Sequence, residues 1–127
     1  MSRRNVSTGG PWEAKIGYSR AVRVGQSVQV SGTTAMTATG LVGKGDPHAQ
    51  TIQALKTIEA ALVEAGASIT DVVRTRIYMA NIDQWQEVGR AHGEVFGSVR
   101  PATTMVEVKR LIDPDMLVEI EADAIIG

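Results

Sequence analysis

Two stretches near the C-terminal end decide the fold: "RPATTMVEVKRL" at residues 100–111 and "MLVEIEADAII" at residues 116–126. Both alternate apolar residues with charged ones, which is typical of a β-strand with one covered face. In the second stretch the charged positions are Glu119, Glu121 and Asp123. These patterns predict two strands and raise the question of what the acidic face meets.

The rest of the chain supplies three more strands. Residues that favour β-structure flank Gly25-Gln26, which indicates a hairpin, and a later segment alternates in the same way as the last two. The predicted strands are 21–24, 28–30, 72–79, 103–108 and 117–126, with a turn at Asp113-Pro114 between the last two.

Two helices are also predicted. Asp46 can cap the first helix, Pro47 suits its first position, and Gly66 suits the position just after its end. The second helix is expected from Asp83 to about Phe96, with apolar residues recurring at helical spacing. Residues 36–46 are rich in Gly and Thr and are expected to form a loop.

The element order is therefore β-β-α-β-α-β-β. Helices that alternate with strands favour an α+β domain with a mixed sheet and both helices on one face. The chain has no internal repeat or linker, so a single domain over residues 1–127 is expected.

The sheet face away from the helices is expected to be amphipathic. If strands 72–79 and 117–126 are neighbours, Arg74 and Arg76 meet the acidic residues across the ladder. In strand 72–79, the residues expected to face the helices are Val73, Thr75, Ile77 and Met79. The charged face also carries apolar residues, namely Val72, Tyr78, Leu117 and Ile125. A plain solvated face would explain the charges, but the apolar members favour burial against another subunit.

Composition excludes several classes of protein. The formal net charge of −1 supplies no basic field for nucleic acid, and aromatic residues make up only 4% of the chain. There is no cysteine, so disulfides and thiolate sites are excluded. No apolar run has the length of a membrane span or of a secretory signal, so no membrane partner and a cytoplasmic location are expected.

With these residues in view, the sequence resembles the RidA/YjgF family of reactive-intermediate deaminases, also called the L-PSP endoribonuclease family. The resemblance spans nearly the whole chain. It rests on "IGYSRAV", "VQVSGTTA", "ALKTIEAALVEAGAS", "DVVRTRIYM", "RPATTMVEV" and "LVEIEADAI".

The resemblance implies a chorismate-mutase-like fold that assembles as a homotrimer, with the sheets inside and small-molecule sites between subunits. It implies hydrolysis of imines or enamines to a keto acid and ammonia, with no metal or organic cofactor. Carried over by position, Tyr18 and the backbone of Ser31 and Gly32 line the pocket, and Glu119 orients the hydrolytic water.

Two positions depart from the family pattern. Thr103 stands where deaminating members have an arginine, whose fork can hold a substrate carboxylate bidentately, and Gly89 stands in place of an asparagine. A hydroxyl cannot supply the missing charge. Arg76, Arg90 and Arg100 are the candidates to replace that anchor.

The histidines and a row of glycines need separate interpretations. His48 and His92 have no third ligand at suitable spacing, so a metal site is not expected, and His92 is interpreted as a packed residue. Gly89, Gly93 and Gly97 recur every four residues. We expect them to allow a close approach of helix to sheet, and a groove for a partner is the alternative.

Three functions remain open at this point. The first is an enzyme that hydrolyses a small imine or a related C–N bond, with altered specificity. The second is a non-catalytic trimer that binds or senses a metabolite. The third, an endoribonuclease, is least favoured because the chain has little basic charge, few aromatic residues and no plausible histidine pair.

Overall fold

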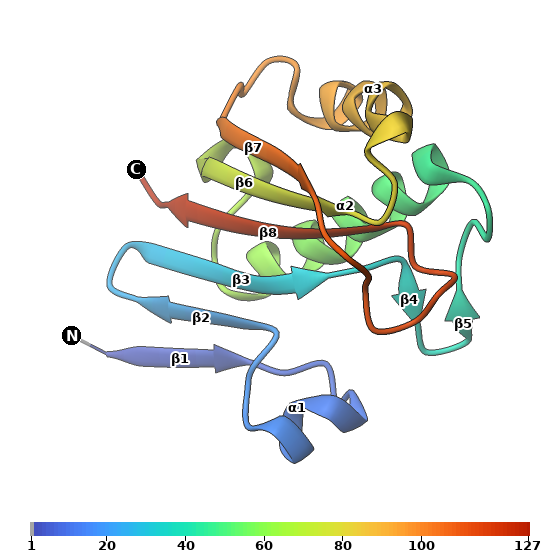
Figure 1. Ribbon diagram of the computed structural model, residues 1–127. Coiled ribbons are helices and arrows are strands. Elements are labelled where there is room, and N and C mark those ends of the chain that lie inside the picture. Colours follow the sequence, from blue (N-terminus) through green and yellow to red (C-terminus); the bar gives the residue numbers. More distant parts are fainter. Residues whose placement is uncertain (1) are drawn as a thin grey trace.

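A computed structural model describes residues 2–127 and arranges six strands in one sheet (Figure 1). The spatial order is β1-β2-β3-β8-β6-β7, in which β6 and β7 are parallel and the other neighbours antiparallel. The strands are β1 (Arg3–Val6), β2 (Ala21–Val24), β3 (Ser27–Thr33), β6 (Val72–Met79), β7 (Ala102–Glu107) and β8 (Val118–Ile125). A separate two-stranded ladder joins β4 (Met36–Thr37) to β5 (Gly40–Leu41).

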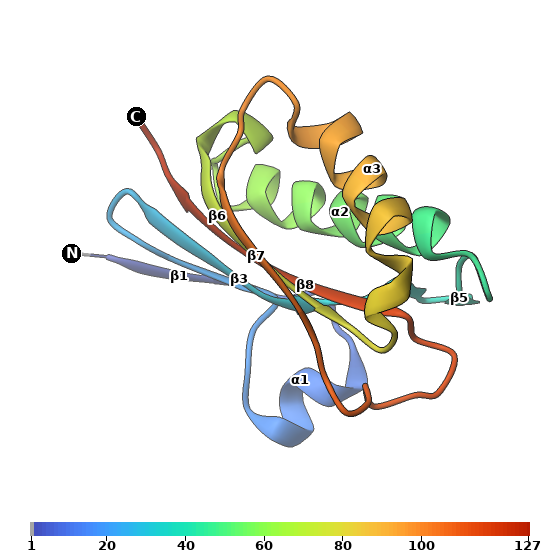
Figure 2. The same cartoon turned by 45° about the horizontal axis from the view of Figure 1, so that its top comes forward.

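Helices α2 (Pro47–Glu64) and α3 (Trp85–Phe96) cover one face of the sheet, and the short α1 (Pro11–Ile16) lies on the other side (Figure 2). Two 3₁₀ turns, Ile69–Asp71 and Ile82–Gln84, precede β6 and α3. The core lies between the two main helices and the sheet; its largest buried side chains include Leu55, Ile58, Leu62, Ile77, Met79, Phe96, Val118 and Ile120. The predicted α+β class, with two main helices on one face, is confirmed.

The ends of α2 follow the predicted signals. Asp46 accepts a hydrogen bond from the backbone N–H of Ala49 at 3.0 Å, and Pro47 occupies the first turn. Gly66 has a φ of 88°, a left-handed conformation that glycine adopts at little cost. The N–H of Ala67 then bonds back to Leu62 O at 2.8 Å and closes the helix.

The predicted charge pairing across β6 and β8 is confirmed. Arg74 lies opposite Asp123 and Arg76 opposite Glu121 in the register. The Arg76 guanidinium is 3.1 Å from the Asp123 carboxylate, and Tyr78 donates its hydroxyl hydrogen bond to Glu121 at 2.6 Å. That bond, together with burial, raises the pKa of Tyr78.

The start of β6 differs from the predicted alternation. Val72 is buried and Val73 is 44% exposed, whereas the sequence pattern had placed Val73 toward the helices. The reason is a register shift between Val72 and Arg74: a β-bulge inserts one extra residue and reverses which side the preceding residue faces.

Several elements escaped the sequence pattern. Strand β1 is polar and mostly exposed, and only its backbone pairing with β2 makes it a strand. Helix α1 has six residues, too few for helical periodicity to show. Its Glu13 is buried and accepts hydrogen bonds from Ser7 at 2.8 Å and from the hydroxyl of Thr8 at 2.5 Å, which tie down the preceding segment. The predicted loop at 36–46 contains the short β4–β5 ladder.

Candidate functional site

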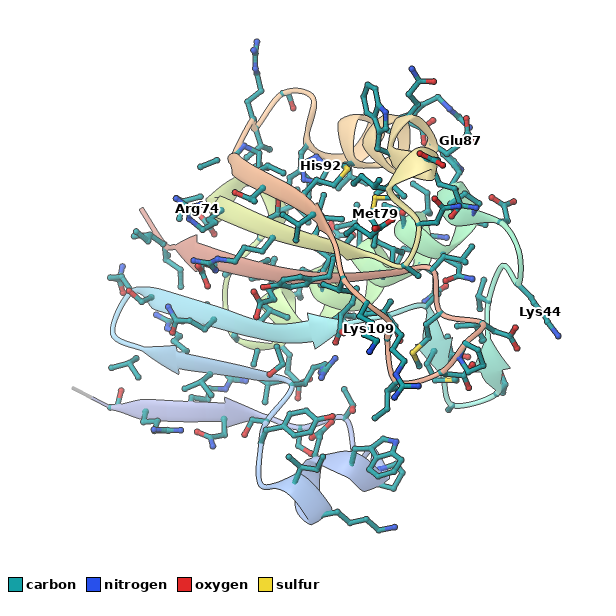
Figure 3. All side chains as sticks on the ribbon, viewed as in Figure 1. Lys44, Arg74, Met79, Glu87, His92 and Lys109 are labelled. Carbon is teal, nitrogen blue, oxygen red and sulfur yellow. The ribbon has the colours of Figure 1, made fainter. Side chains whose placement is uncertain are left out.

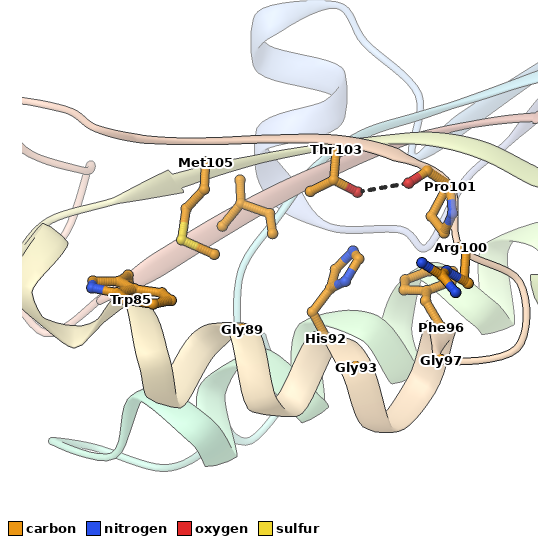
Figure 4. Close-up of a pocket in the computed structure, with 11 residues that line it drawn as sticks. Trp85, Gly89, His92, Gly93, Phe96, Gly97, Arg100, Pro101, Thr103 and Met105 are labelled. Atoms are coloured by element: carbon orange, nitrogen blue, oxygen red, sulfur yellow. Dashed lines mark hydrogen bonds between the residues drawn. The ribbon is translucent and has the colours of Figure 1, made fainter.

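A groove lies between α3 and the edge strand β7, with a volume of about 440 Å³. Figure 4 shows Trp85 at one end, Arg100 at the other, and His92 facing Thr103 between them. Trp85 is 54% exposed and forms part of this wall. The lining residues besides these four are Ile77, Gly89, Gly93, Phe96, Gly97, Pro101 and Met105.

Hydrogen bonds connect the two walls of the groove. His92 projects from α3 toward the sheet (Figure 3), and its Nε2 lies 2.9 Å from the hydroxyl of Thr75. That hydroxyl lies 2.8 Å from the hydroxyl of Thr103, which donates to the carbonyl of Pro101 at 3.2 Å. Each threonine hydroxyl has one hydrogen to donate. Thr103 donates its hydrogen to Pro101, so it accepts from Thr75. Thr75 in turn accepts from the Nε2–H of His92. Burial lowers the pKa of His92, so the neutral ring is favoured.

The glycines of α3 do not serve a close approach to the sheet. A Cβ added at Gly89 or Gly93 would meet no atom within 4 Å, apart from the helix's own neighbouring backbone. Both residues line the groove, and the alternative interpretation, a groove for a partner, stays a prediction. At Gly97 a Cβ would lie 2.8 Å from Gly93 O, a crowding against the helix itself.

Arg100 has an unusual backbone conformation. Its φ is 58°, in the left-handed region, and its N–H bonds to Phe96 O at 2.8 Å. A left-handed residue that closes a helix end in this way is usually glycine, and another residue there costs about 1 kcal/mol or more. The sequence had named Arg100 only as one of three replacement cations; its position before Pro101 and just after a helix was the available signal.

A second hollow, of about 430 Å³, lies beside α1 and β2. Tyr18 and Ser31, two residues that the family resemblance assigns to a pocket, both line this hollow, and their role in ligand binding stays a prediction. The hydroxyl of Ser31 donates to Ser19 O at 2.7 Å, which fixes that side chain. The guanidinium of Arg20 lies 5.7 Å from the centre of the Tyr18 ring, close enough for a cation–π contact.

Glu119 does not line this hollow but lies against Gly32, the residue after Ser31, at a bulge in β3. The register between β3 and β8 shifts between Val30 and Thr33, which places Ser31 and Gly32 in irregular backbone. A Cβ on Gly32 would overlap the Glu119 carboxylate, so glycine leaves room for it. Sequence patterns do not reveal such a bulge, although a Ser-Gly pair within a strand is a signal for one.

Glu119 is the most unusual carboxylate of this surface. It is partly buried, and burial raises the pKa of its carboxyl, an effect that nearby Arg20 opposes and Glu121 reinforces. Arg20 itself donates to Gly32 O at 3.1 Å and to the Thr33 hydroxyl at 3.0 Å, while its buried Nε has no partner within residues 2–127. The arrangement places a proton acceptor beside polar backbone and a fixed positive charge.

The other two candidate cations lie elsewhere. Arg76 pairs with Asp123 and Glu121 on the sheet face away from the main helices. Arg90 pairs with Glu87 at 2.8 Å and Glu94 at 3.3 Å on the exposed side of α3. Neither lines the groove or the hollow.

One chain does not bring Glu119 and Thr103 together. Thr103 is in register with Thr75, which is buried on the helix side, whereas Glu119 alternates with the buried Val118 and Ile120 and so faces the other side. Strand β6 separates their strands, which adds about 10 Å along the sheet. The candidate site is therefore two surfaces: the carboxylate surface (Tyr18, Arg20, Ser31, Gly32 and Glu119) and the α3–β7 groove.

Residues 2–127 contain neither a cluster of metal-binding side chains nor a membrane-spanning helix. No group of three or more histidine and acidic side chains is placed to hold a metal ion in this part of the chain. No helix there has the length and apolar character needed to cross a membrane.

Comparison with known proteins places this geometry in a family. Protein SCO2049 of Streptomyces coelicolor is 45% identical over 124 residues, which cover 98% of this chain and 92% of that protein. A human protein named 2-iminobutanoate/2-iminopropanoate deaminase is 33% identical over 128 residues, covering 100% of this chain and 93% of its own length. A protein of Acinetobacter baylyi named 3-aminoacrylate deaminase RutC is 33% identical over 108 residues, covering 84% and 85%.

The solved structures agree. The crystal structure of Rv2704 from Mycobacterium tuberculosis, described as a member of the YjgF/YER057c/UK114 family, matches with a TM-score of 0.89 and 54% identity, covering 98% of this chain and 100% of that one. The model of the family described as Endoribonuclease L-PSP matches residues 11–126. The resemblance drawn from the sequence is thus confirmed, and the chain belongs to the endoribonuclease L-PSP family, the group that includes the YjgF proteins.

Proposed function

We propose that this protein hydrolyses small reactive imines or enamines to carbonyl compounds and ammonia. The observation that carries the proposal is Glu119, a partly buried carboxylate with a raised pKa beside the Ser31–Gly32 bulge. A group used as both proton acceptor and donor works best when its pKa is close to the working pH, and burial moves Glu119 in that direction. Two relatives whose names state an imine or aminoacrylate deaminase activity support the same reaction class.

The proposed reaction needs two proton transfers. Water adds to the imine carbon, forming a C–O bond while the C=N electrons move to nitrogen, and Glu119 passes the water proton to that nitrogen. The resulting carbinolamine then loses its hydroxyl proton through Glu119 to nitrogen. The C–N bond breaks, ammonia leaves, and the carbonyl remains. Arg20 would stabilise the carboxylate form between transfers, because it lowers the Glu119 pKa.

The proposal includes a homotrimer in which each site combines the carboxylate surface of one subunit with the α3–β7 groove of another. Three observations support it: the two surfaces lie on opposite faces of one sheet, the face bearing Glu119 mixes charged and apolar residues, and the two main helices cover only the opposite face. Light scattering at micromolar concentration should report three times the chain mass of 13.5 kDa. A monomer mass would contradict the shared site.

The activity test uses an imino acid made in place by an amino-acid oxidase. Ammonia and keto acid are measured with and without the protein, while semicarbazide traps imine that has not been hydrolysed. The proposal expects the protein to lower semicarbazone yield and to speed ammonia release. Unchanged semicarbazone over a range of side chains would contradict hydrolysis.

A second candidate function is a trimer that binds a metabolite without turnover. The observation that favours it is the groove itself, where Thr103 and Gly89 stand at the positions at which the resemblance implies an arginine and an asparagine. A protein without the carboxylate-binding arginine can keep the fold and the pocket while no longer catalysing the reaction. Ligand binding without any effect on imine lifetime would favour this function over the first.

A further inference from the structure

The α3–β7 groove joins an apolar body to a single charged end. Its walls are formed largely by the side chains of Trp85, Phe96, Met105 and Ile77, and open space lies over Gly89 and Gly93. Arg100 is the one lining residue that is charged at neutral pH, since burial keeps the ring of His92 neutral. The volume of about 440 Å³ lies in the range of small-molecule sites.

Arg100 is also free to bind a ligand. Within residues 2–127 no carboxylate forms an ion pair with it, whereas Arg76 and Arg90 are each paired with two acidic side chains. Arg100 is exposed, so its guanidinium keeps its charge and its donors toward the groove mouth.

The backbone of Arg100 is held at the end of the groove. The N–H of Arg100 is bonded to Phe96 O at 2.8 Å, and the rigid ring of Pro101 follows it. A left-handed φ of 58° at this position favours glycine, yet an arginine occupies it. The conformation places the side chain of Arg100 at the end of the groove opposite Trp85 (Figure 4).

We propose that Arg100 binds the carboxylate of a ligand whose larger apolar side chain occupies the α3–β7 groove. The ligand class is therefore 2-imino acids with branched or aromatic side chains and the 2-oxo acids formed from them. The guanidinium fork matches a carboxylate with two parallel hydrogen bonds, and the Thr103 hydroxyl lines the wall between this anchor and Trp85. This assignment of substrate rests on the proposed function, but the binding it predicts does not depend on turnover.

The test measures equilibrium binding, which separates it from the hydrolysis assay. The probes are 4-methyl-2-oxopentanoate and its uncharged amide, titrated calorimetrically into the wild type and into Arg100→Gln, Arg100→Gly and Lys56→Gln. The glycine variant suits the left-handed backbone and keeps the fold while it removes the guanidinium. Lys56 is an exposed residue of α2 and serves as the matched loss of one positive charge far from the groove lining.

The wild type should bind the carboxylate more tightly than the amide. Both Arg100 variants should weaken carboxylate binding by about tenfold, as expected for loss of a charge-assisted hydrogen-bond partner at an exposed groove mouth, and leave amide binding within about twofold. Lys56→Gln should change neither. The proposal is overturned if the wild type binds neither probe, if the Arg100 variants weaken both probes equally, or if they leave carboxylate binding intact. A reduced oligomer mass in the Arg100 variants would also overturn it, because Arg100 would then pair with a carboxylate of a second copy.

Discussion

The carboxylate surface and the α3–β7 groove belong to the same sheet but are built by different means. The first lies in the middle of the sheet, where β3 and β8 are paired on both sides and one bulge exposes the Ser31–Gly32 backbone to Glu119. The second lies at the edge, where β7 has one neighbour and α3 carries glycines over open space. A proton-transferring group needs a fixed position, which the centre of a sheet provides. A pocket that selects a side chain needs room, which the edge provides.

The largest expected effect is at the fixed surface. Glu119→Gln keeps the shape of the side chain and removes its proton-accepting charge, so kcat/KM for imine hydrolysis should fall by about 10²-fold to 10⁴-fold. The measurement is the semicarbazone competition assay on wild type and variant of equal oligomer mass. Glu64→Gln, at an exposed position of α2, is the control and should retain full activity. Full activity in Glu119→Gln would mean that another group moves the protons.

The pH dependence of stability checks the same residue without substrate. The folded state raises the pKa of Glu119, so folding favours its protonated form, and this stabilising contribution is lost as pH rises through the folded pKa. Glu119→Gln should therefore be more stable than the wild type at neutral pH. The difference should shrink as pH falls below the ordinary glutamate pKa. Urea denaturation across this range measures it, and an equal or lower stability of the variant at neutral pH would show that the charge is paired across a subunit interface.

The next largest effect, on kcat, is expected at Gly32 in the β3 bulge, which leaves room for the Glu119 carboxylate. Gly32→Ala places a methyl group against the carboxylate, which must rotate away. A displacement of about 1 Å can cost on the order of 10²-fold in rate, so kcat should fall by roughly tenfold to a hundredfold while the fold persists. Steady-state kinetics and circular dichroism report the two properties separately. An unchanged kcat would remove the argument that this glycine positions the carboxylate.

A smaller change is expected from altering the groove. Thr103→Arg adds a guanidinium on β7, where the resemblance implies that one belongs, and should raise kcat/KM for the short 2-iminopropanoate by about tenfold. The wild type should be correspondingly weak on this substrate. The two proteins are compared on the same imine, made by an amino-acid oxidase. If kcat/KM of the wild type is at least as high as that of the variant, the threonine at position 103 does not limit activity on this substrate.

The smallest effect is one of stability and tests why α3 keeps its glycines. Gly89→Ala and Gly93→Ala meet no clash, so each should raise the free energy of unfolding by up to about 1 kcal/mol while reducing ligand binding in the groove. Gly97→Ala is the control, since its Cβ would lie 2.8 Å from Gly93 O and should not stabilise. Urea unfolding and the calorimetric titration above measure both properties. Stabilised variants with unchanged ligand binding would show that the space over these glycines is not used.

Local signals predicted much of the fold. The β8 alternation and the capping residue and terminal glycine of α2 are short-range patterns, and each is present in the structure. They succeed because strand alternation and helix ends depend on neighbours within a few residues. By contrast, β1 was missed because its only support is backbone pairing with a strand fifteen or more residues away.

By itself, the sequence determined the α+β class, the two main helices and the family, together with Tyr18, Ser31, Gly32, Glu119 and Thr103 as candidates through resemblance. Tertiary structure decided which of them share a surface. A β-bulge shifts the alternation of a strand by one residue. The bulge in β6 reverses the side that Val73 faces, and the bulge in β3 leaves space for the Glu119 carboxylate. Tertiary structure also separated the three candidate arginines. Arg76 is bound by Asp123 of a neighbouring strand, whereas Arg90 is bound by acids of its own helix. Of the three, Arg100 is the one that lines the groove, and its place there depends on the packing of α3 against β7.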